Sequence, residues 1–254
     1  MAGRRIGEDV MSLLRVESLN KRFGGLLAVS QVTFEVQEGE IVGLIGPNGA
    51  GKTTLFNLIT GAITPDSGRV TFNGQDLKGL STYQICRAGI ARTFQVPRPF
   101  PKMTCSENVL VALIGRNIPV PQPERPRTIR EMLELVGLAG KERVLSGDLN
   151  LIDTKRLEVA RALATGPRLI LLDEVLGGLS SLEMSQALDL IRAIRDRFGV
   201  TVLWIEHVMG AIMSLSERVL VLNRGRLICE GPPAGITRDK RVIEAYLGEP
   251  DAQD

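Results

Sequence analysis

The sequence predicts an α/β fold with a mainly parallel sheet, and two features of the chain carry this prediction. First, Leu169–Leu172 and Thr201–Ile205 are dominated by apolar residues, which is typical of strands buried on both faces. Second, a run with helical apolar spacing, Leu182–Phe198, separates them, and strands that alternate with helices form parallel sheets with crossovers. The 254 residues suffice for one large domain or two small ones.

The first third of the chain is rich in strand signals. Short β-branched runs with polar or glycine breaks predict strands at Leu14–Ser18, Val32–Val36, Ile41–Ile45 and Val70–Phe72. The turn Glu38-Gly39-Glu40 predicts that the second and third of these form a hairpin. A glycine-rich loop at Gly46–Gly51 then leads into a helix from Lys52 to about Thr60.

Helical spacing dominates the middle of the chain. It predicts helices over Thr104–Ile114, Thr128–Val136 and Thr154–Ala164. Four prolines between the first two, at positions 119, 121, 123 and 126, predict an exposed linker without regular structure. Near the end, Arg218–Asn223 and Arg226–Glu230 form a hairpin through Arg224-Gly225, and a last helix covers about Lys240–Leu247.

Composition and charge limit the classes of function. The net charge is +2, so bulk electrostatics give no support to a nucleic-acid partner. No apolar run approaches the roughly 20 residues that span a bilayer, and the N-terminus lacks the apolar core of a secretory signal. The three cysteines have no metal-ligand spacing and are expected to be free thiols in a reducing compartment. These features favour a cytoplasmic protein, which leaves attachment to a membrane protein open.

The glycine-rich loop fits a phosphate-binding pattern. Gly46-Pro47-Asn48-Gly49-Ala50-Gly51-Lys52-Thr53 matches G-x-x-x-x-G-K followed by Ser or Thr, between a strand and a helix. Glycines let successive N–H groups turn inward to phosphate oxygens, and the helix N-terminus adds positive charge. Lys52 would reach the β- and γ-phosphates, and Thr53 would bind Mg²⁺. The alternative is a plain glycine-rich turn, which the Lys-Thr pair and the flanking strand argue against.

Two further strands end in polar residues that chemistry on phosphate needs. Asp173 and Glu174 follow one buried strand, and His207 follows the other. Ligands of open α/β sheets bind at the carboxyl ends of the strands, so Asp173 would face Mg²⁺ and Glu174 would orient or deprotonate a water. His207, the only histidine, would donate to a γ-phosphate oxygen. The alternatives are a solvated acidic turn and a structural histidine.

In this order, these pieces resemble the ATP-binding-cassette (ABC) ATPases over essentially the whole chain from Leu13 to Leu247. The resemblance implies a phosphate-loop NTPase core with a mainly parallel sheet, an antiparallel β subdomain and a small helical subdomain at about 96–165. A disordered extension over residues 1–12 would precede this domain, and a tail over residues 248–254 would follow it.

The resemblance also implies ATP and Mg²⁺ as cofactors, ATP hydrolysis as the activity, and a role for each matching residue. ATP would be bound by Phe23, which stacks on adenine, and by Gly46, Pro47, Asn48, Gly49, Ala50, Gly51, Lys52, Thr53 and Thr54. The catalytic residues would be Glu174 as base, His207 as switch histidine, Gln95 and Lys52. The metal would be held by Thr53, Gln95 and Asp173.

Within the family, four segments look like the ATP-binding subunits of branched-chain amino-acid importers: 23–29, 56–61, 91–95 and 242–248. The implied function is to power import of branched-chain amino acids or related small solutes, from the cytoplasmic face of the cell membrane. The implied partners are membrane permease subunits and a second ATPase subunit, without nucleic acid. We expect the permease to dock on Gln95–Met103 and the helix Thr104–Ile114, where Phe100 stands on a proline-stiffened loop.

One family motif departs from its usual sequence. Members carry Leu-Ser-Gly-Gly-Gln a fixed distance before the arginine that is Arg161 here, which places the signature at Leu149–Asp153. Leu145-Ser146-Gly147 lies four residues too early and is expected to be a chance match. In the signature, Ile152 is bulky and Asp153 is negative, although Asp153 would cap a helix from Thr154.

The altered signature can impair hydrolysis of the ATP that the partner holds. Alternatively, its backbone N–H groups can still suffice to bind the γ-phosphate. Val175 and Ser180 also replace the family's proline and aspartate at the dimer interface. We therefore expect a heterodimer with unequal ATP sites, with a homodimer left open. The alternative is a weakly hydrolysing regulatory nucleotide-binding module.

Overall fold

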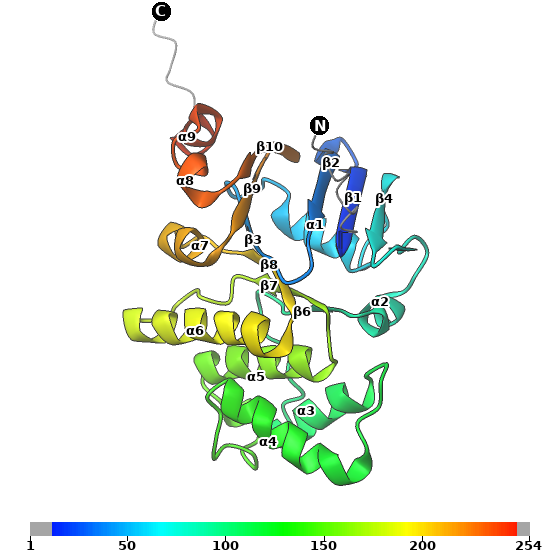
Figure 1. The fold of residues 1–254 in the computed structure, drawn as a ribbon, viewed down its shortest axis with the longest axis vertical. Helices are drawn as coiled ribbons and strands as arrows, with labels where there is room; N and C mark the ends of the chain where they lie inside the picture. Colours follow the sequence, from blue (N-terminus) through cyan, green and yellow to red (C-terminus); the bar gives the residue numbers. More distant parts are fainter. Residues whose placement is uncertain (1–11, 248–254) are drawn as a thin grey trace, which may run out of the picture.

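The computed structural model describes residues 12–247, which form two sheets and a layer of helices (Figure 1). The fold is α/β, as the sequence predicts. The expected N-terminal extension, apart from Ser12, and the expected C-terminal tail lie outside the described residues.

The larger sheet has six strands in the order β10-β9-β3-β8-β7-β6. Its strands are β3 (Ile41–Ile45), β6 (Ile90–Arg92), β7 (Leu169–Asp173), β8 (Thr201–Ile205), β9 (Arg218–Asn223) and β10 (Arg226–Gly231). All neighbouring pairs are parallel except the closing hairpin β9–β10. Every residue of β3, β7 and β8 is buried, as continuous apolar strands require. The carboxyl ends of these three strands meet at one edge of the sheet.

The smaller sheet is antiparallel and has the order β2-β1-β4-β5. Its strands are β1 (Leu14–Phe23), β2 (Leu26–Val36), β4 (Ser67–Phe72) and β5 (Gln75–Asp76). Phe23 lies opposite Leu26, so the hairpin turn is Gly24-Gly25. The predicted hairpin between Val32–Val36 and Ile41–Ile45 is therefore wrong. Because both faces of β3 are buried, it takes parallel partners in the centre of the other sheet, and the turn at Gly39 carries the chain between sheets.

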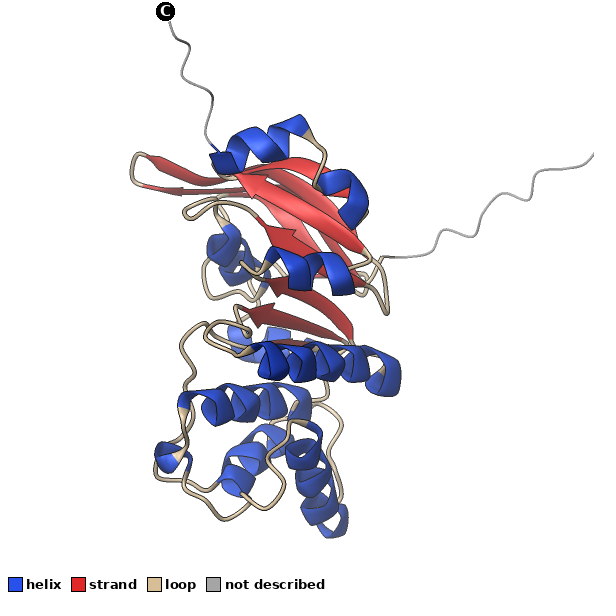
Figure 2. Ribbon diagram, turned by 90° about the vertical axis from the view of Figure 1, so that its left-hand side faces the viewer, coloured by secondary structure: helices blue, strands red, loops and turns tan. Residues whose placement is uncertain are grey.

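Three helices pack against one another at one end of the molecule, below the six-stranded sheet (Figures 1 and 2). They are α3 (Cys105–Ile114), α4 (Arg125–Leu135) and α5 (Leu151–Ala164). The predicted unstructured linker is wrong at its end: a 3-10 turn covers Gln122–Glu124, and α4 begins at Arg125. Pro126 lies in the first turn of α4, where a missing N–H is tolerated.

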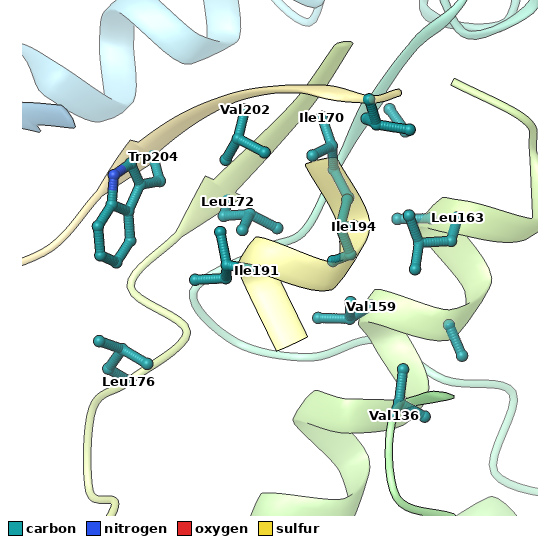
Figure 3. Close-up of a cluster of buried hydrophobic side chains, with 14 of the residues drawn as sticks. Val136, Val159, Leu163, Ile170, Leu172, Leu176, Ile191, Ile194, Val202 and Trp204 are labelled. Carbon is teal, nitrogen blue, oxygen red and sulfur yellow. The ribbon is translucent and has the colours of Figure 1, made fainter. Parts of the chain in front are cut away.

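The other helices cover the sheets. They are α1 (Lys52–Ile59), α2 (Thr82–Ala88), α6 (Ser181–Phe198), α7 (Met209–Leu215), α8 (Pro233–Ile236) and α9 (Lys240–Leu247). Side chains of α5 and α6 meet those of β7 and β8 in one apolar cluster that includes Val159, Leu163, Ile191 and Trp204 (Figure 3). Within residues 12–247, no helix combines the length and apolar character needed to cross a membrane.

Candidate nucleotide site

The phosphate loop depends on two glycines that no other residue could replace without backbone movement. Gly46 has φ 151°, and a Cβ there would lie 2.1 Å from the carbonyl oxygen of Leu222. Gly51 has φ 103°, and its Cβ would lie 2.4 Å from the carbonyl oxygen of Ala28. The loop is thereby held tightly between β2 and β9 and curls ahead of α1. This is the geometry in which backbone N–H groups form an anion site.

Lys52 is the first residue of α1 and is only 6% exposed. Its ammonium donates to the carbonyl oxygens of Gly46 at 2.7 Å and Pro47 at 3.1 Å. Burial lowers the pKa of this ammonium, and the nearby carboxylates of Glu174 and Asp173 oppose that shift. The cation is therefore confined beneath the loop, where a phosphate group would lie.

The three residues predicted to act on the attacking water lie together. The Nε2 atom of Gln95 donates to Oε2 of Glu174 at 2.6 Å, and Nε2 of His207 lies 2.6 Å from Oε1 of the same carboxylate. Glu174 has a positive φ of 52°, and its N–H donates to the carbonyl oxygen of Ile205. This turn directs the carboxylate away from β7 toward the end of β8. A carboxylate oriented by two polar neighbours is suited to accept a proton from water.

Asp173 ends β7 and is 1% exposed. Its Oδ2 atom accepts from Arg92 at 2.8 Å, while Oδ1 is buried without a hydrogen-bond partner. Burial raises the pKa of this carboxyl group, and the Arg92 bond opposes that shift. An unpartnered carboxylate oxygen suits a hard cation such as Mg²⁺. Within the described part of the chain, there is no cluster of three or more His, Cys, Asp or Glu side chains that could hold a metal.

A cavity of about 860 Å³ gathers most of the predicted site residues. Those that line it are Phe23, Asn48, Gly49, Ala50, Gly51, Lys52, Thr53, Thr54, Gln95, Glu174 and His207. Gly46, Pro47 and Asp173 are not among the lining residues. Phe23 is 47% exposed at the end of β1, so its ring is available for stacking.

Sequence reasoning missed four lining residues, Leu26, Leu27, Ala28 and Arg224. Arg224 lies in the β9–β10 turn, whose Gly225 donates to Ala50 and accepts from Ser30. These bonds bring the turn against both the phosphate loop and β2. The hairpin was predicted, but no local signal in the sequence shows which distant loop its turn contacts.

The stretch around the altered signature also differs from expectation. Helix α5 begins at Leu151, three residues before the predicted start, because the side chain of Asn150 caps it by accepting from the N–H of Asp153 at 2.8 Å. The prediction that Asp153 is the cap is therefore wrong. Asp153 lies inside the first turn, 5% exposed, and forms an ion pair with Lys141.

The early Leu145-Ser146-Gly147 has an internal structural role. Ser146 is 2% exposed in a 3-10 turn, and its hydroxyl donates to the carbonyl oxygen of Phe100 at 2.7 Å. Asn108 donates to the same hydroxyl at 3.1 Å. Because this serine is buried, it is not available to a partner's ligand, and the register that starts at Leu149 is the one placed at a helix N-terminus.

Two family models match the chain. The ABC transporter model matches residues 29–177. A second model, for the branched-chain amino acid ATP-binding cassette transporter, matches residues 226–252.

Among curated proteins, the chain is 42% identical over 250 residues to the high-affinity branched-chain amino acid transport ATP-binding protein LivG of Salmonella typhimurium. The match covers 93% of this chain and 98% of that protein. Among solved structures, the ADP conformation of an ATP-binding cassette of an ABC transporter matches with a TM-score of 0.83 and 31% identity, over 94% of this chain and 100% of the other. A dimeric bacterial ABC transporter cassette matches with a TM-score of 0.79 and 25% identity, over 87% and 98%.

Proposed function

This chain belongs to the ABC transporter ATPases, and from that premise we propose that it powers the import of branched-chain amino acids or related small solutes. The observation that carries the choice of substrate is the match of residues 226–252 to the branched-chain transporter model. None of the residues of this segment that the structure describes, 226–247, lines the nucleotide cavity. The near full-length similarity to LivG supports the same choice.

In the proposed site, the loop Gly46–Thr54 binds the phosphates of ATP through its backbone N–H groups, which only Pro47 lacks, and through the ammonium of Lys52, and Phe23 stacks on adenine. Thr53, Asp173 and Gln95 would hold Mg²⁺, and the metal would neutralise charge on the phosphates. Glu174 accepts the proton of the attacking water, and Gln95 and His207 orient its carboxylate. The support is geometric: Gln95 and His207 both lie 2.6 Å from Glu174, in one cavity with the loop.

The chain works as half of a dimer, in which the N-terminus of α5 faces ATP held by the other subunit. Asn150 uses its side chain to cap α5, and Ser180 uses its hydroxyl to cap α6 by accepting from Glu183. Leu151, 62% exposed, stands beside Ile152 in the slots that are glycine in the family. These features favour a heterodimer with unequal ATP sites, in which the partner's signature completes the site of this chain. Asp153 forms an ion pair with Lys141, so its carboxylate is not directed at the partner's phosphates. This lowers the charge repulsion that the altered signature would otherwise cause.

The membrane permease docks beside Gln95, on the loop that carries Phe100. The ring of Phe100 is 42% exposed, while the backbone N–H and carbonyl of this residue are tied to Asn108 and Ser146. The guanidinium of Arg161 lies over the Phe100 ring, 4.9 Å from its centroid, and makes a cation–π contact with it. A rigid loop with an exposed aromatic ring loses little entropy on binding. The subunit would therefore sit at the cytoplasmic face of the membrane, held by its partners.

The test is reconstitution of this chain with two permeases, a second ATPase subunit and a binding protein encoded beside it. We expect ATP-dependent uptake of labelled leucine into proteoliposomes, competed by isoleucine and valine and lost with Lys52→Ala. Uptake of a solute of another class, with none of leucine, would contradict the substrate proposal. A complex that binds ATP but turns over equally slowly with or without transport partners would favour the regulatory module, which the altered signature also suggests.

A further inference from the structure

Arg92 is a buried cation at the end of β6. It contacts Asp173 on β7, Asn57 on α1 and the ring of Phe94. Its side chain is 7% exposed. One terminal nitrogen donates to Oδ2 of Asp173 at 2.8 Å, and the other donates to Oδ1 of Asn57, on α1, at 2.5 Å. Arg92 therefore joins the strand that carries the acid to the helix that follows the phosphate loop.

Two aromatic rings lie within cation–π distance of the Arg92 guanidinium. It lies 5.6 Å from the ring centroid of Phe56 on α1 and 5.3 Å from that of Phe94, next to Gln95. Arg98 lies over Phe94 in turn, at 5.5 Å. Two hydrogen bonds and two ring contacts leave the guanidinium little freedom, which suits the planar fork of arginine and not the point charge of lysine.

This contact makes the two oxygens of Asp173 unequal. Oδ2 is held by Arg92, whereas Oδ1 has no partner although it is buried. Buried polar atoms in proteins are nearly always hydrogen-bonded, so an unpartnered one needs an explanation. The simplest explanation is that Oδ1 binds a group that arrives with the nucleotide. The hydrogen bond from Arg92 to Oδ2 then fixes the direction of Oδ1.

We propose that Arg92 is a positioning residue that holds the Asp173 carboxylate with Oδ1 directed at the metal ion of a metal–nucleotide complex. Arg92 does not line the nucleotide cavity, and its proposed effect is exerted through Asp173. The inference rests on the proposed role of Asp173 in metal binding and adds to it the residue that orients the acid. Partners that orient a metal ligand typically change metal affinity by about 10- to 100-fold when they are removed.

The experiment measures metal binding apart from turnover. Mn²⁺ is titrated into the purified full-length chain with ATP, and free Mn²⁺ is followed by electron paramagnetic resonance. Binding of a fluorescent ATP analogue in EDTA is measured on the same samples. For Arg92→Met we expect Mn²⁺ affinity to fall about 10-fold or more, while metal-free nucleotide affinity changes less than about threefold. Arg92→Lys should lose most of the same affinity, because lysine cannot contact Asp173 and Asn57 together.

Two controls separate the possible failures. The first control is Arg218→Met. Arg218 lies on β9 of the same six-stranded sheet and pairs with Glu40, so its removal should leave Mn²⁺ binding unchanged. The second variant, Asn57→Ala, keeps the pair of Arg92 with Asp173 but removes the acceptor of the other Arg92 nitrogen. It should weaken Mn²⁺ binding to a smaller extent than Arg92→Met. It therefore tests the positioning role if Arg92→Met fails to fold. Unchanged or tighter Mn²⁺ binding by a folded Arg92→Met or Arg92→Lys, with Asp173→Asn impaired, would overturn the role of Arg92 alone. Unchanged binding in Asp173→Asn would overturn the metal assignment as well.

Discussion

Lys52 shows how a single position combines backbone and side-chain chemistry. Its N–H belongs to the N-terminus of α1, and its ammonium is confined beneath the loop by two carbonyl oxygens. Lys52→Ala should weaken ATP binding by about 10- to 100-fold, since hydrogen bonds to charged groups are worth about 1.5–3 kcal/mol. Titration calorimetry on the purified chain measures this, with Lys78→Ala, an exposed lysine in a turn, as control. Equal affinity in Lys52→Ala and the parent would remove Lys52 from the site.

At the residue scale, the sequence identifies side chains that a short motif carries and misses those that only the fold brings in. Lys52 is predicted from the glycine-rich motif, and Asp173 and Glu174 are predicted from the buried strand that they follow. Arg224 and the contact of Arg92 with Asn57 depend on pairings between distant segments, which no local pattern encodes.

At the element scale, β8 is followed directly by a buried acid with a structural role. Glu206 is 4% exposed and accepts from the N–H of Leu176 at 2.7 Å, and burial raises its pKa to about 7. Between pH 4.5, the usual value for glutamate, and about 7, the folded state keeps this proton while the unfolded state loses it. Glu206 therefore makes the free energy of unfolding fall as pH rises through that window.

Glu206→Gln keeps an acceptor oxygen for Leu176 but cannot ionise. Between pH 4.5 and 7, we expect the free energy of unfolding to fall more steeply for the parent than for this variant. The difference in slope against pH should approach that of one bound proton. Urea unfolding followed by circular dichroism measures both slopes. Glu217→Gln, at an exposed position after α7, should keep the parent's slope. Parallel pH profiles for the parent and Glu206→Gln would show that Glu206 does not hold its proton in the folded protein.

Element boundaries show why the sequence predicts some parts of the fold better than others. The bounds of β8 and β9 match their predicted ranges, since continuous burial leaves a clear apolar pattern. The start of α5 was misplaced because Asn150 and Asp153 are both good caps, and the choice depends on Lys141, which pairs with the aspartate. The pairing of β2 was misplaced because a turn signal does not specify which sheet the next strand enters. Helices α2, α7 and α8 were not predicted, since they have only 7, 7 and 4 residues, too few for a repeating apolar pattern.

At the scale of the whole molecule, we propose that the altered signature faces ATP held by a partner subunit. Restoring the family residues with Asn150→Ser, Leu151→Gly and Ile152→Gly should raise the steady-state ATPase rate of the isolated chain. Serine keeps the cap of α5, whereas each glycine costs up to about 1 kcal/mol, so the unfolding midpoint must be measured alongside the rate.

The matched control for the signature is Asp148→Gly, an exposed position that would complete Leu-Ser-Gly-Gly in the early register. It should leave the ATPase rate unchanged, because Ser146 is buried against Phe100. A higher rate in Asp148→Gly, with no change in the folded triple variant, would place the signature at Leu145.

The central claim is that this chain holds its own working ATP site and drives a transporter with it. The most direct measurement is the rate of phosphate release by the assembled complex carrying Glu174→Gln in this chain alone. The amide keeps the shape of the side chain but is no base, so we expect the rate to fall by about 100-fold or more while ATP affinity stays within about threefold. A complex that releases phosphate at the parent rate with Glu174→Gln in place would contradict the account.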